Sequence, residues 1–234
     1  MPATAPRGAR GTRLGRSRED YLKALYDLAP AGPAAVSVLA RRLGVSAPSV
    51  TNMLARLAEA RLVALGHRGA ARLTPEGERE ALRMVRRHRI LETFLVRVLG
   101  LDWAEVHEDA EELEHHVSDR VLDALDRHMS HPTEDPHGHP IPDPRGRLPR
   151  RALVPLHALP GGAQARVREI RDRDQGRMGR WKRAGLVPGA TVRMRRANLE
   201  DDVFELDVDG RKLVVGHEAL EGVHVERPRR EGSA

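Results

Sequence analysis

Residues 84–118, MVRRHRILETFLVRVLGLDWAEVHEDAEELEHHVS, decide how the middle of this chain folds. Gly100 divides the stretch, so its apolar spacing predicts one helix that ends just before Gly100 and a second that begins after Asp102. The first helix starts upstream at Thr74-Pro75, a cap followed by a proline at the first helical position. It carries more apolar residues than a lone helix buries, which predicts a helical dimerisation surface. These apolar residues are Leu82, Val85, Ile90, Leu91, Phe94, Leu95 and Val98.

Histidine and acidic side chains lie at helical spacing in both predicted helices, and four of the twelve histidines fall in this stretch. Side chains three or four residues apart project from one side of a helix, so each set can converge on an ion. One helix contributes three ligands at most, so a further ligand has to come from a remote part of the sequence. The residues are His88 and Glu92 on the first helix and His107, Glu111, Glu114 and His115 on the second. We interpret them as a pair of candidate divalent-metal sites, and the alternative is a solvated acidic helix face.

The candidate ligands are carboxylates and imidazoles, and the chain contains no cysteine. Hard oxygen ligands combined with imidazole favour Mn²⁺ or Fe²⁺ over ions that prefer sulfur. The general affinity order favours other divalent ions in solution, so we expect Zn²⁺, Co²⁺ or Cd²⁺ to substitute in vitro.

Upstream, residues 36–63 (VSVLARRLGVSAPSVTNMLARLAEARLV) have the pattern of a helix-turn-helix, with the turn at Gly44. Ser46 caps the second helix, whose outward N-terminal residues are small and polar and would read base edges in the major groove. A basic hairpin around Arg68 follows directly and has the position of a wing that contacts phosphate or the minor groove. The predicted DNA-binding residues are Ser46, Pro48, Ser49, Thr51, Asn52 and Arg68.

Composition limits the remaining possibilities. The chain has 234 residues, a formal charge of +6 and a pI near 10.5, which is compatible with nucleic acid as a partner. It lacks a run of apolar residues long enough to span a membrane, so we expect a soluble, cytoplasmic protein with no membrane partner.

The fold class expected is a multidomain α+β protein. It combines an N-terminal winged helix-turn-helix, an all-α dimerisation and metal-binding domain, and a small C-terminal β-barrel. Six prolines between residues 130 and 150 predict an extended linker, in which three histidines would lie in turns. The predicted boundaries are 1–16 for a disordered basic arm, 17–74, 75–130, 131–153 for the linker, and 154–227.

Several of these segments, in this order and spacing, make the chain similar to the DtxR/MntR family of metal-dependent repressors. They are EDYLKALY, LARRLGVSAPSVTNMLARLAEARLV, LTPEGE, RRHRILETFL, GLDWAEVHEDAEELEHHVSD and PHGHPIP. The C-terminal PLHALPGGAQARV and AGLVPGATV resemble the SH3-like (FeoA-type) domain that many members carry. The resemblance covers nearly the whole chain, from Ser17 to about Glu226.

The resemblance implies two metal sites. Asp20 becomes the remote ligand of a primary site with Glu111, Glu114 and His115, and an ancillary site contains His88, Glu92 and His107. Acidic residues at the positions of Asp20 and Glu111 match the manganese-type branch of the family. That branch has a glutamate where this chain has Lys23, so we expect two separated sites instead of a binuclear centre. Members with an SH3-like domain also take ancillary ligands from it, and the matching region here contains Asp172, Asp174 and Gln175.

The function implied is a homodimeric repressor that is activated by metal, Mn²⁺ or Fe²⁺, and binds a double-stranded pseudo-palindromic operator. Metal-uptake genes are the expected targets. The alternatives are a metal-independent winged-helix regulator and a carboxylate/histidine metalloenzyme. We expect no enzymatic activity, because the sequence offers no separate nucleophile or general base beside the candidate ligands.

Overall fold

A computed structural model describes residues 18–172, 174–198 and 200–226. The predicted basic arm, residues 1–16, lies outside the described residues. The chain divides into two compact units, Met1–Met84 and Val85–Ala234, and the helix α4 (Pro75–Arg97) runs through the division.

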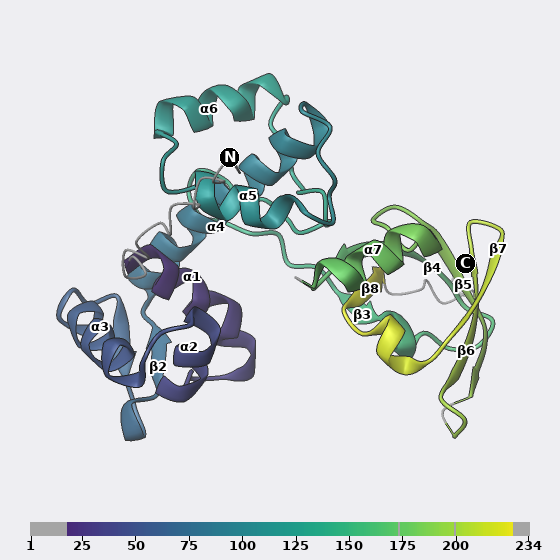
Figure 1. Ribbon diagram of the computed structural model, residues 1–234, viewed down its shortest axis with the longest axis horizontal. Coiled ribbons are helices and arrows are strands. Elements are labelled where there is room, and N and C mark those ends of the chain that lie inside the picture. Colours follow the sequence, from purple (N-terminus) through teal and green to yellow (C-terminus); the bar gives the residue numbers. More distant parts are fainter. Residues whose placement is uncertain (1–17, 173, 199, 227–234) are drawn as a thin grey trace, which may run out of the picture. The chain divides into compact units, whose positions relative to one another are not determined.

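The first unit contains three helices and a two-stranded hairpin around one apolar core (Figure 1). Its elements are α1 (Arg18–Leu28), η1 (Ala29–Ala31), α2 (Val36–Leu43), α3 (Ala47–Glu59), β1 (Val63–Leu65), η2 (His67–Gly69) and β2 (Ala71–Leu73). Helices α2 and α3 form the predicted helix-turn-helix, and β1 and β2 pair antiparallel as its wing.

Two local signals set the geometry of the helix-turn-helix. Gly44 has φ +65° and ends α2 in the left-handed conformation, which costs glycine little. Ser46 then caps α3, because its hydroxyl oxygen accepts a hydrogen bond from the Ser49 N–H. Val50, Leu54 and Leu57 face the core of the unit, so the opposite face of α3 is exposed.

The second predicted helix of the second unit is shorter at both ends than the sequence predicts. Helix α5 spans Val106–Leu113 and α6 spans Asp119–His128, so Glu114 and His115 lie in the turn after α5. The guanidinium of Arg87 on α4 donates to the carbonyls of Glu114 and Val117, which therefore need no further helical turn. This contact between distant residues ends α5 early.

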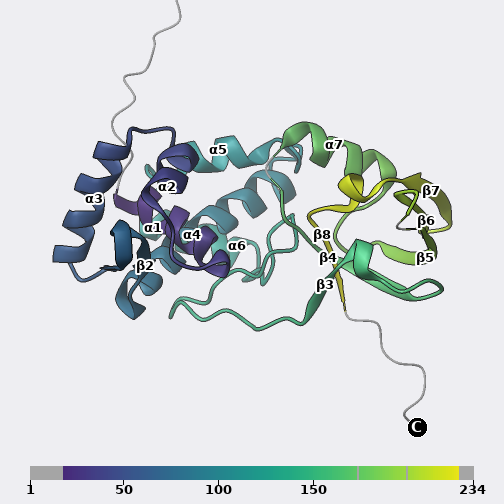
Figure 2. The same cartoon turned by 90° about the horizontal axis from the view of Figure 1, so that it is seen from below.

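The C-terminal part of the second unit is a six-stranded sheet with helix α7 packed against it (Figure 2). The strand order is β3-β8-β4-β5-β6-β7, with neighbours antiparallel. The elements are β3 (Leu153–Pro155), η3 (Leu156–Ala158), β4 (Gln164–Ile170), α7 (Gln175–Ala184), β5 (Thr191–Asn198), β6 (Val203–Val208), β7 (Arg211–Val215), η4 (His217–Leu220) and β8 (Val223–Glu226). Pairing among the described residues leaves the sheet open, so this part is a β-sheet domain in which the predicted barrel closure is not seen.

Within residues 18–172, 174–198 and 200–226, none of the helices has both the length and the apolar composition that crossing a bilayer requires.

Candidate metal centre and nucleic-acid interface

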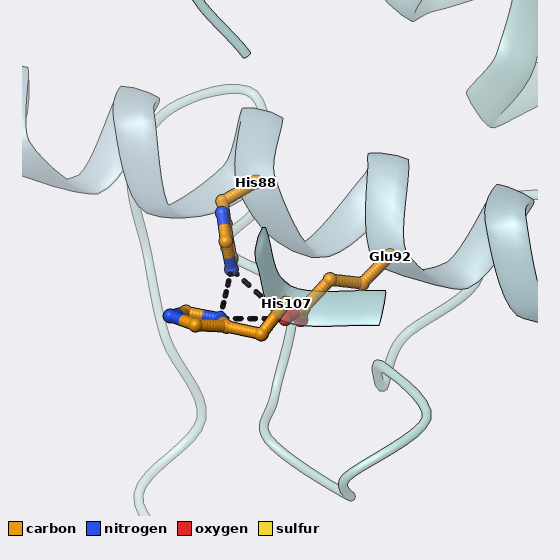
Figure 3. A group of neighbouring side chains, drawn as sticks. All are labelled: His88, Glu92 and His107. Carbon is orange, nitrogen blue, oxygen red and sulfur yellow. Dashed lines mark hydrogen bonds and ion pairs between the residues drawn. The ribbon is translucent and has the colours of Figure 1, made fainter. Parts of the chain in front are cut away.

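Three predicted ligands meet between α4 and α5 (Figure 3). We call His88, Glu92 and His107 the helical cluster. His88 Nε2 lies 2.9 Å from Glu92 Oε1 and 3.0 Å from His107 Nδ1, and His107 Nδ1 lies 3.1 Å from Glu92 Oε1. His88 and Glu92 are buried, at 6% and 2% exposure. The i, i+4 spacing on α4 therefore brings these side chains together as predicted, although each one's role as a ligand stays a prediction.

The donor chemistry of the helical cluster fits a divalent cation. Two imidazole nitrogens and one carboxylate oxygen converge where water has little access, which leaves lone pairs facing one another. A proton or a cation has to occupy such a triangle, because unpaired acceptors are costly when buried. Ligand atoms about 3 Å apart are also what an octahedral ion with bonds of about 2.1 Å would place side by side.

Two predicted primary-site carboxylates touch the outer nitrogens of the helical cluster. His88 Nδ1 lies 2.6 Å from Glu114 Oε2, and His107 Nε2 lies 3.4 Å from Glu111 Oε1. An imidazole that donates its outer N–H to a carboxylate presents the lone pair of its inner nitrogen to a metal. The contacts with Glu111 and Glu114 therefore orient the two imidazole rings of the helical cluster.

His137 approaches the helical cluster from the Pro-rich segment and was not among the predicted ligands. Its Nε2 lies 2.7 Å from the Trp103 carbonyl oxygen and donates to it, while its Nδ1 lies 3.6 Å from Glu92 Oε2. Burial disfavours the charged imidazole, but the hydrogen bond with Glu92 and the charges of Glu92 and Asp135 raise the pKa of His137 to about 9. With Nε2 fixed by a carbonyl, Nδ1 is left to hold either a proton or a cation beside Glu92.

Glu92 is the carboxylate on which these imidazoles converge. Burial raises its pKa, but the charge of His88 and hydrogen bonds from three histidines, His88, His107 and His137, hold the pKa well below its usual range. Glu92 is therefore ionised at neutral pH inside the protein, which is the state that binds metal.

Asp135, His137 and His139 form a second group of converging donor atoms, which we call the loop cluster. His139 Nδ1 lies 3.2 Å from Asp135 Oδ2, and Asp135 is 4% exposed. Burial raises the pKa of Asp135, whereas the charge and the hydrogen bond of His139 lower it below its usual value. Arg89 Nε lies 3.6 Å from the same carboxylate, so Asp135 already has a permanent cation beside it.

The loop that carries this cluster is docked on strand β4. The Ile170 N–H donates to the His137 carbonyl, and His139 Nε2 lies 3.7 Å from Glu169 Oε1. Gly138 has φ +84°, and a Cβ there would stand 1.8 Å from the Arg168 carbonyl oxygen, so only glycine fits. The loop thus connects the helical cluster with the C-terminal sheet.

The predicted primary site is only partly assembled within one unit. His115 Nε2 lies 3.8 Å from Glu114 Oε1, while Glu111 contacts His107. Asp20 is half-buried in the first turn of α1, which belongs to the other unit, so its role stays a prediction.

The C-terminal residues considered as extra ligands have other contacts. Asp174 caps α7 by accepting from the Arg177 N–H. Asp172 accepts from the Asp174 N–H and pairs with Arg177 at 3.2 Å. Neither of the two clusters in the second unit includes Asp172, Asp174 or Gln175.

Sequence reasoning missed Asp135 and His137, which were assigned to an extended linker with turn histidines. The structure buries both, and Ile141 of the same segment packs into the helical core. The signal available was the pair of histidines on either side of Gly138, because a glycine needed for backbone conformation argues for an ordered loop.

The predicted DNA-binding residues lie where DNA can reach them. All six side chains are exposed. Five lie in or next to the first two turns of α3, and one lies at the tip of the wing. They are Ser46, Pro48, Ser49, Thr51, Asn52 and Arg68. Contact of each residue with DNA remains a prediction.

Three family models match the chain in succession. "Iron dependent repressor, N-terminal DNA binding domain" matches residues 13–71. "Iron dependent repressor, metal binding and dimerisation domain" matches residues 74–143, and "FeoA domain" matches residues 154–227. The helical and loop clusters both fall inside the second match.

Individual proteins extend the similarity. The iron-dependent repressor IdeR of Mycobacterium tuberculosis is 34% identical over 187 residues, which cover 74% of this chain and 81% of IdeR. The transcriptional regulator MntR of Salmonella typhimurium is 42% identical over 122 residues, 50% of this chain and 77% of MntR. A solved manganese-dependent transcriptional repressor in complex with manganese superposes with a TM-score of 0.82 and 35% identity, covering 90% of this chain and 99% of that one.

Proposed function

We propose a metal-activated switch for this chain, which belongs to the DtxR/MntR family of metal-dependent transcriptional repressors. Its relatives are repressors with a DNA-binding domain, and this chain is likewise a metal-dependent, DNA-binding transcriptional repressor. The observation that carries the switch is the buried helical cluster inside the metal-binding and dimerisation domain.

We assign the helical cluster as the ancillary metal site and add His137 to its ligands. His88 and His107 present their inner nitrogens, Glu92 supplies the charge, and His137 Nδ1 faces the same carboxylate. The bound ion supplies positive charge that the four side chains then share. Without it, the imidazole of His137, whose pKa is raised to about 9, supplies positive charge beside Glu92.

The proposed primary site consists of Asp20, Glu111, Glu114 and His115. Its ligands come from both units, so their shared coordination would restrict how the first unit moves relative to the second. Two recognition helices with a fixed separation fit two successive major grooves, which is the reason to expect a symmetric operator.

The two proposed sites are coupled through Glu114. One of its oxygens accepts from His88 Nδ1 at 2.6 Å and the other lies 3.8 Å from His115 Nε2. A change at either site therefore alters the hydrogen bonding of the other, which supports cooperative filling of two separate sites.

Mn²⁺ is the metal we propose, with Fe²⁺ as the alternative. The similar proteins include an iron-dependent repressor and a solved manganese-dependent repressor, and the donor set of this chain contains only carboxylates and imidazoles. Zn²⁺, Co²⁺ and Cd²⁺ would substitute in vitro.

We further propose a homodimer that acts on operator DNA in the cytoplasm. Several apolar side chains of the helical domain remain exposed and would be covered by a second copy. They are Val98, Leu99, Leu101, Leu113 and Val121. We retain as proposals the domain boundaries 17–74, 75–130 and 154–227 and the SH3-like barrel for residues 154–227. The segment 131–153 is more than an extended linker, because Asp135, His137 and Ile141 within it are buried.

The decisive experiment measures binding of chelator-stripped protein to its own upstream promoter DNA during titration with Mn²⁺, Fe²⁺ or Zn²⁺. We expect tight DNA binding only in the presence of metal. Because coupling between two binding sites is reciprocal, DNA should raise the affinity for metal by the same factor, which typically corresponds to a coupling free energy of about 1–3 kcal/mol. Glu114→Ala should abolish the metal response, whereas Glu112→Ala, a change at an exposed neighbour, should keep it.

Two outcomes would favour the alternatives. Equal DNA binding in the presence of chelator would indicate a metal-independent winged-helix regulator. Turnover of esters or phosphoesters by the metal-loaded protein at enzyme-like rates would indicate a metalloenzyme. Asp20→Met adds a third measurement, because it should change the order of metal preference if Asp20 is a ligand.

A further inference from the structure

The outward face of α3 carries one side chain suited to reading a base pair. Pro48, Asn52, Ala55 and Glu59 follow one another at spacings of four, three and four residues and are all exposed. This row lies opposite the buried row of the helix, so Asn52 occupies the middle of the face that a major groove would meet.

The neighbouring hydroxyl groups are partly committed to the helix itself. Ser46 donates its hydroxyl proton to Ser49 Oγ at 3.0 Å and accepts from the Ser49 N–H. Thr51 donates its hydroxyl proton to the Ala47 carbonyl at 3.1 Å. The hydroxyl protons of Ser46 and Thr51 are therefore already used in hydrogen bonds within the N-terminal part of α3.

The side chain of Asn52 differs from these hydroxyl groups in its hydrogen bonding. Among the described residues its carboxamide makes no hydrogen bond. A carboxamide presents a donor and an acceptor side by side, whereas a hydroxyl group cannot pair with two atoms of a base in this way. Adenine offers the complementary pattern in the major groove, with its N7 as acceptor and its N6 amino group as donor.

We propose that Asn52 recognises one adenine in each operator half-site by a bidentate hydrogen bond. This inference rests on the proposed DNA-binding function and adds the identity of the base pair. The amide N–H of Asn52 donates to adenine N7, and its carbonyl oxygen accepts from adenine N6. Pro48 and Ala55 stand four residues before and three residues after Asn52 on the same exposed face of α3, and their apolar side chains suit an adjacent thymine methyl group.

The test starts with selection of duplexes from a random library by the full-length protein with Mn²⁺. The wild type should enrich an adenine at one fixed position of each half-site. Asn52→Ala should lose that preference and keep the others, while Thr51→Val should keep the adenine preference whatever its total affinity. An Asn52→Ala variant that enriches the same adenine to the same degree would overturn the proposal.

A second measurement tests the atoms involved. Replacing the selected adenine by 7-deazaadenine removes N7, and with it one of the two hydrogen bonds, and should weaken wild-type binding about threefold to tenfold. The same replacement should change binding of Asn52→Ala less than about twofold. Equal losses in both proteins would mean that Asn52 does not contact this base.

A parallel arm with chelator separates this inference from the proposed metal switch. Adenine selection that is equally strong with chelator would contradict metal activation and support the role of Asn52. Metal-dependent selection in which Asn52→Ala retains the adenine would support the switch and contradict the role of Asn52.

Discussion

The helical cluster and the loop cluster lie in the same unit and share a neighbour, yet they are built differently. The helical cluster takes two members from one turn of α4, so its geometry follows from backbone periodicity. The loop cluster lies in an irregular segment that is held by hydrogen bonds to β4 and by Arg89. The first cluster is preorganised by local structure, and the second depends on tertiary contacts.

The largest expected effect is that of Glu92→Gln, because Glu92 contacts both clusters. The substitution keeps the shape of the side chain but removes the charge among three imidazoles. We expect metal affinity at the helical cluster to fall more than about a hundredfold. This loss exceeds the roughly 10–100-fold that is typical when a residue that only hydrogen-bonds to a metal ligand is replaced. Calorimetric titration with Mn²⁺ measures this, with Glu112→Gln at an exposed position as the control. Unchanged Mn²⁺ affinity in Glu92→Gln would show that the helical cluster is not a metal site.

The pH dependence of the metal-free protein tests whether the clusters communicate through His137. Its raised pKa means that its contribution to stability is complete below about 6.5 and is lost as pH rises through about 9. Glu92, with a lowered pKa, contributes above its ordinary value of 4.5 and loses its contribution on acidification. The contribution of His137 is on the order of 3 kcal/mol.

Chemical denaturation of chelated protein between pH 6 and pH 10 should therefore show stability falling toward alkaline pH. His137→Asn should remove most of this slope. A variant with the same slope as the wild type would show that the His137–Glu92 contact does not stabilise the metal-free state.

Gly138→Ala tests the dependence of the loop cluster on docking. The new Cβ would meet the Arg168 carbonyl in a backbone conformation that favours glycine. We expect a loss of about 2 kcal/mol in the free energy of unfolding, or release of the loop, with little change in α4. Gly161→Ala is the control, because a Cβ there meets open space. Equal stability of the two variants would contradict tight docking.

His139→Asn should have the smallest effect. His139 is partly exposed, and its ion pair within the loop cluster is with Asp135, beside which Arg89 also lies. We expect Mn²⁺ affinity to change less than about tenfold, as for an outer contact. A loss as large as that of Glu92→Gln would show that the loop cluster is itself a principal metal site.

The sequence predicts the structure well where interactions between residues close together in the chain determine it. The Ser46 cap, the Gly44 turn and the i, i+4 pair on α4 placed the helix-turn-helix and two members of the helical cluster. The early end of α5 could not be predicted in this way, because it depends on Arg87 reaching carbonyls about 30 residues away. The burial of His137 likewise depends on Trp103 and β4, and the proline content of its segment indicates only the absence of regular structure.

The docked loop also provides a reporter of its own state. The amide of Ile170 donates to the His137 carbonyl across the boundary between loop and sheet. Its rate of hydrogen exchange measures how often the loop lifts from β4, independently of DNA and of any spectroscopic signal from a metal. If addition of Mn²⁺ slows hydrogen exchange at this amide, then an ion bound at the helices stabilises the contact between the loop and a strand of the C-terminal sheet.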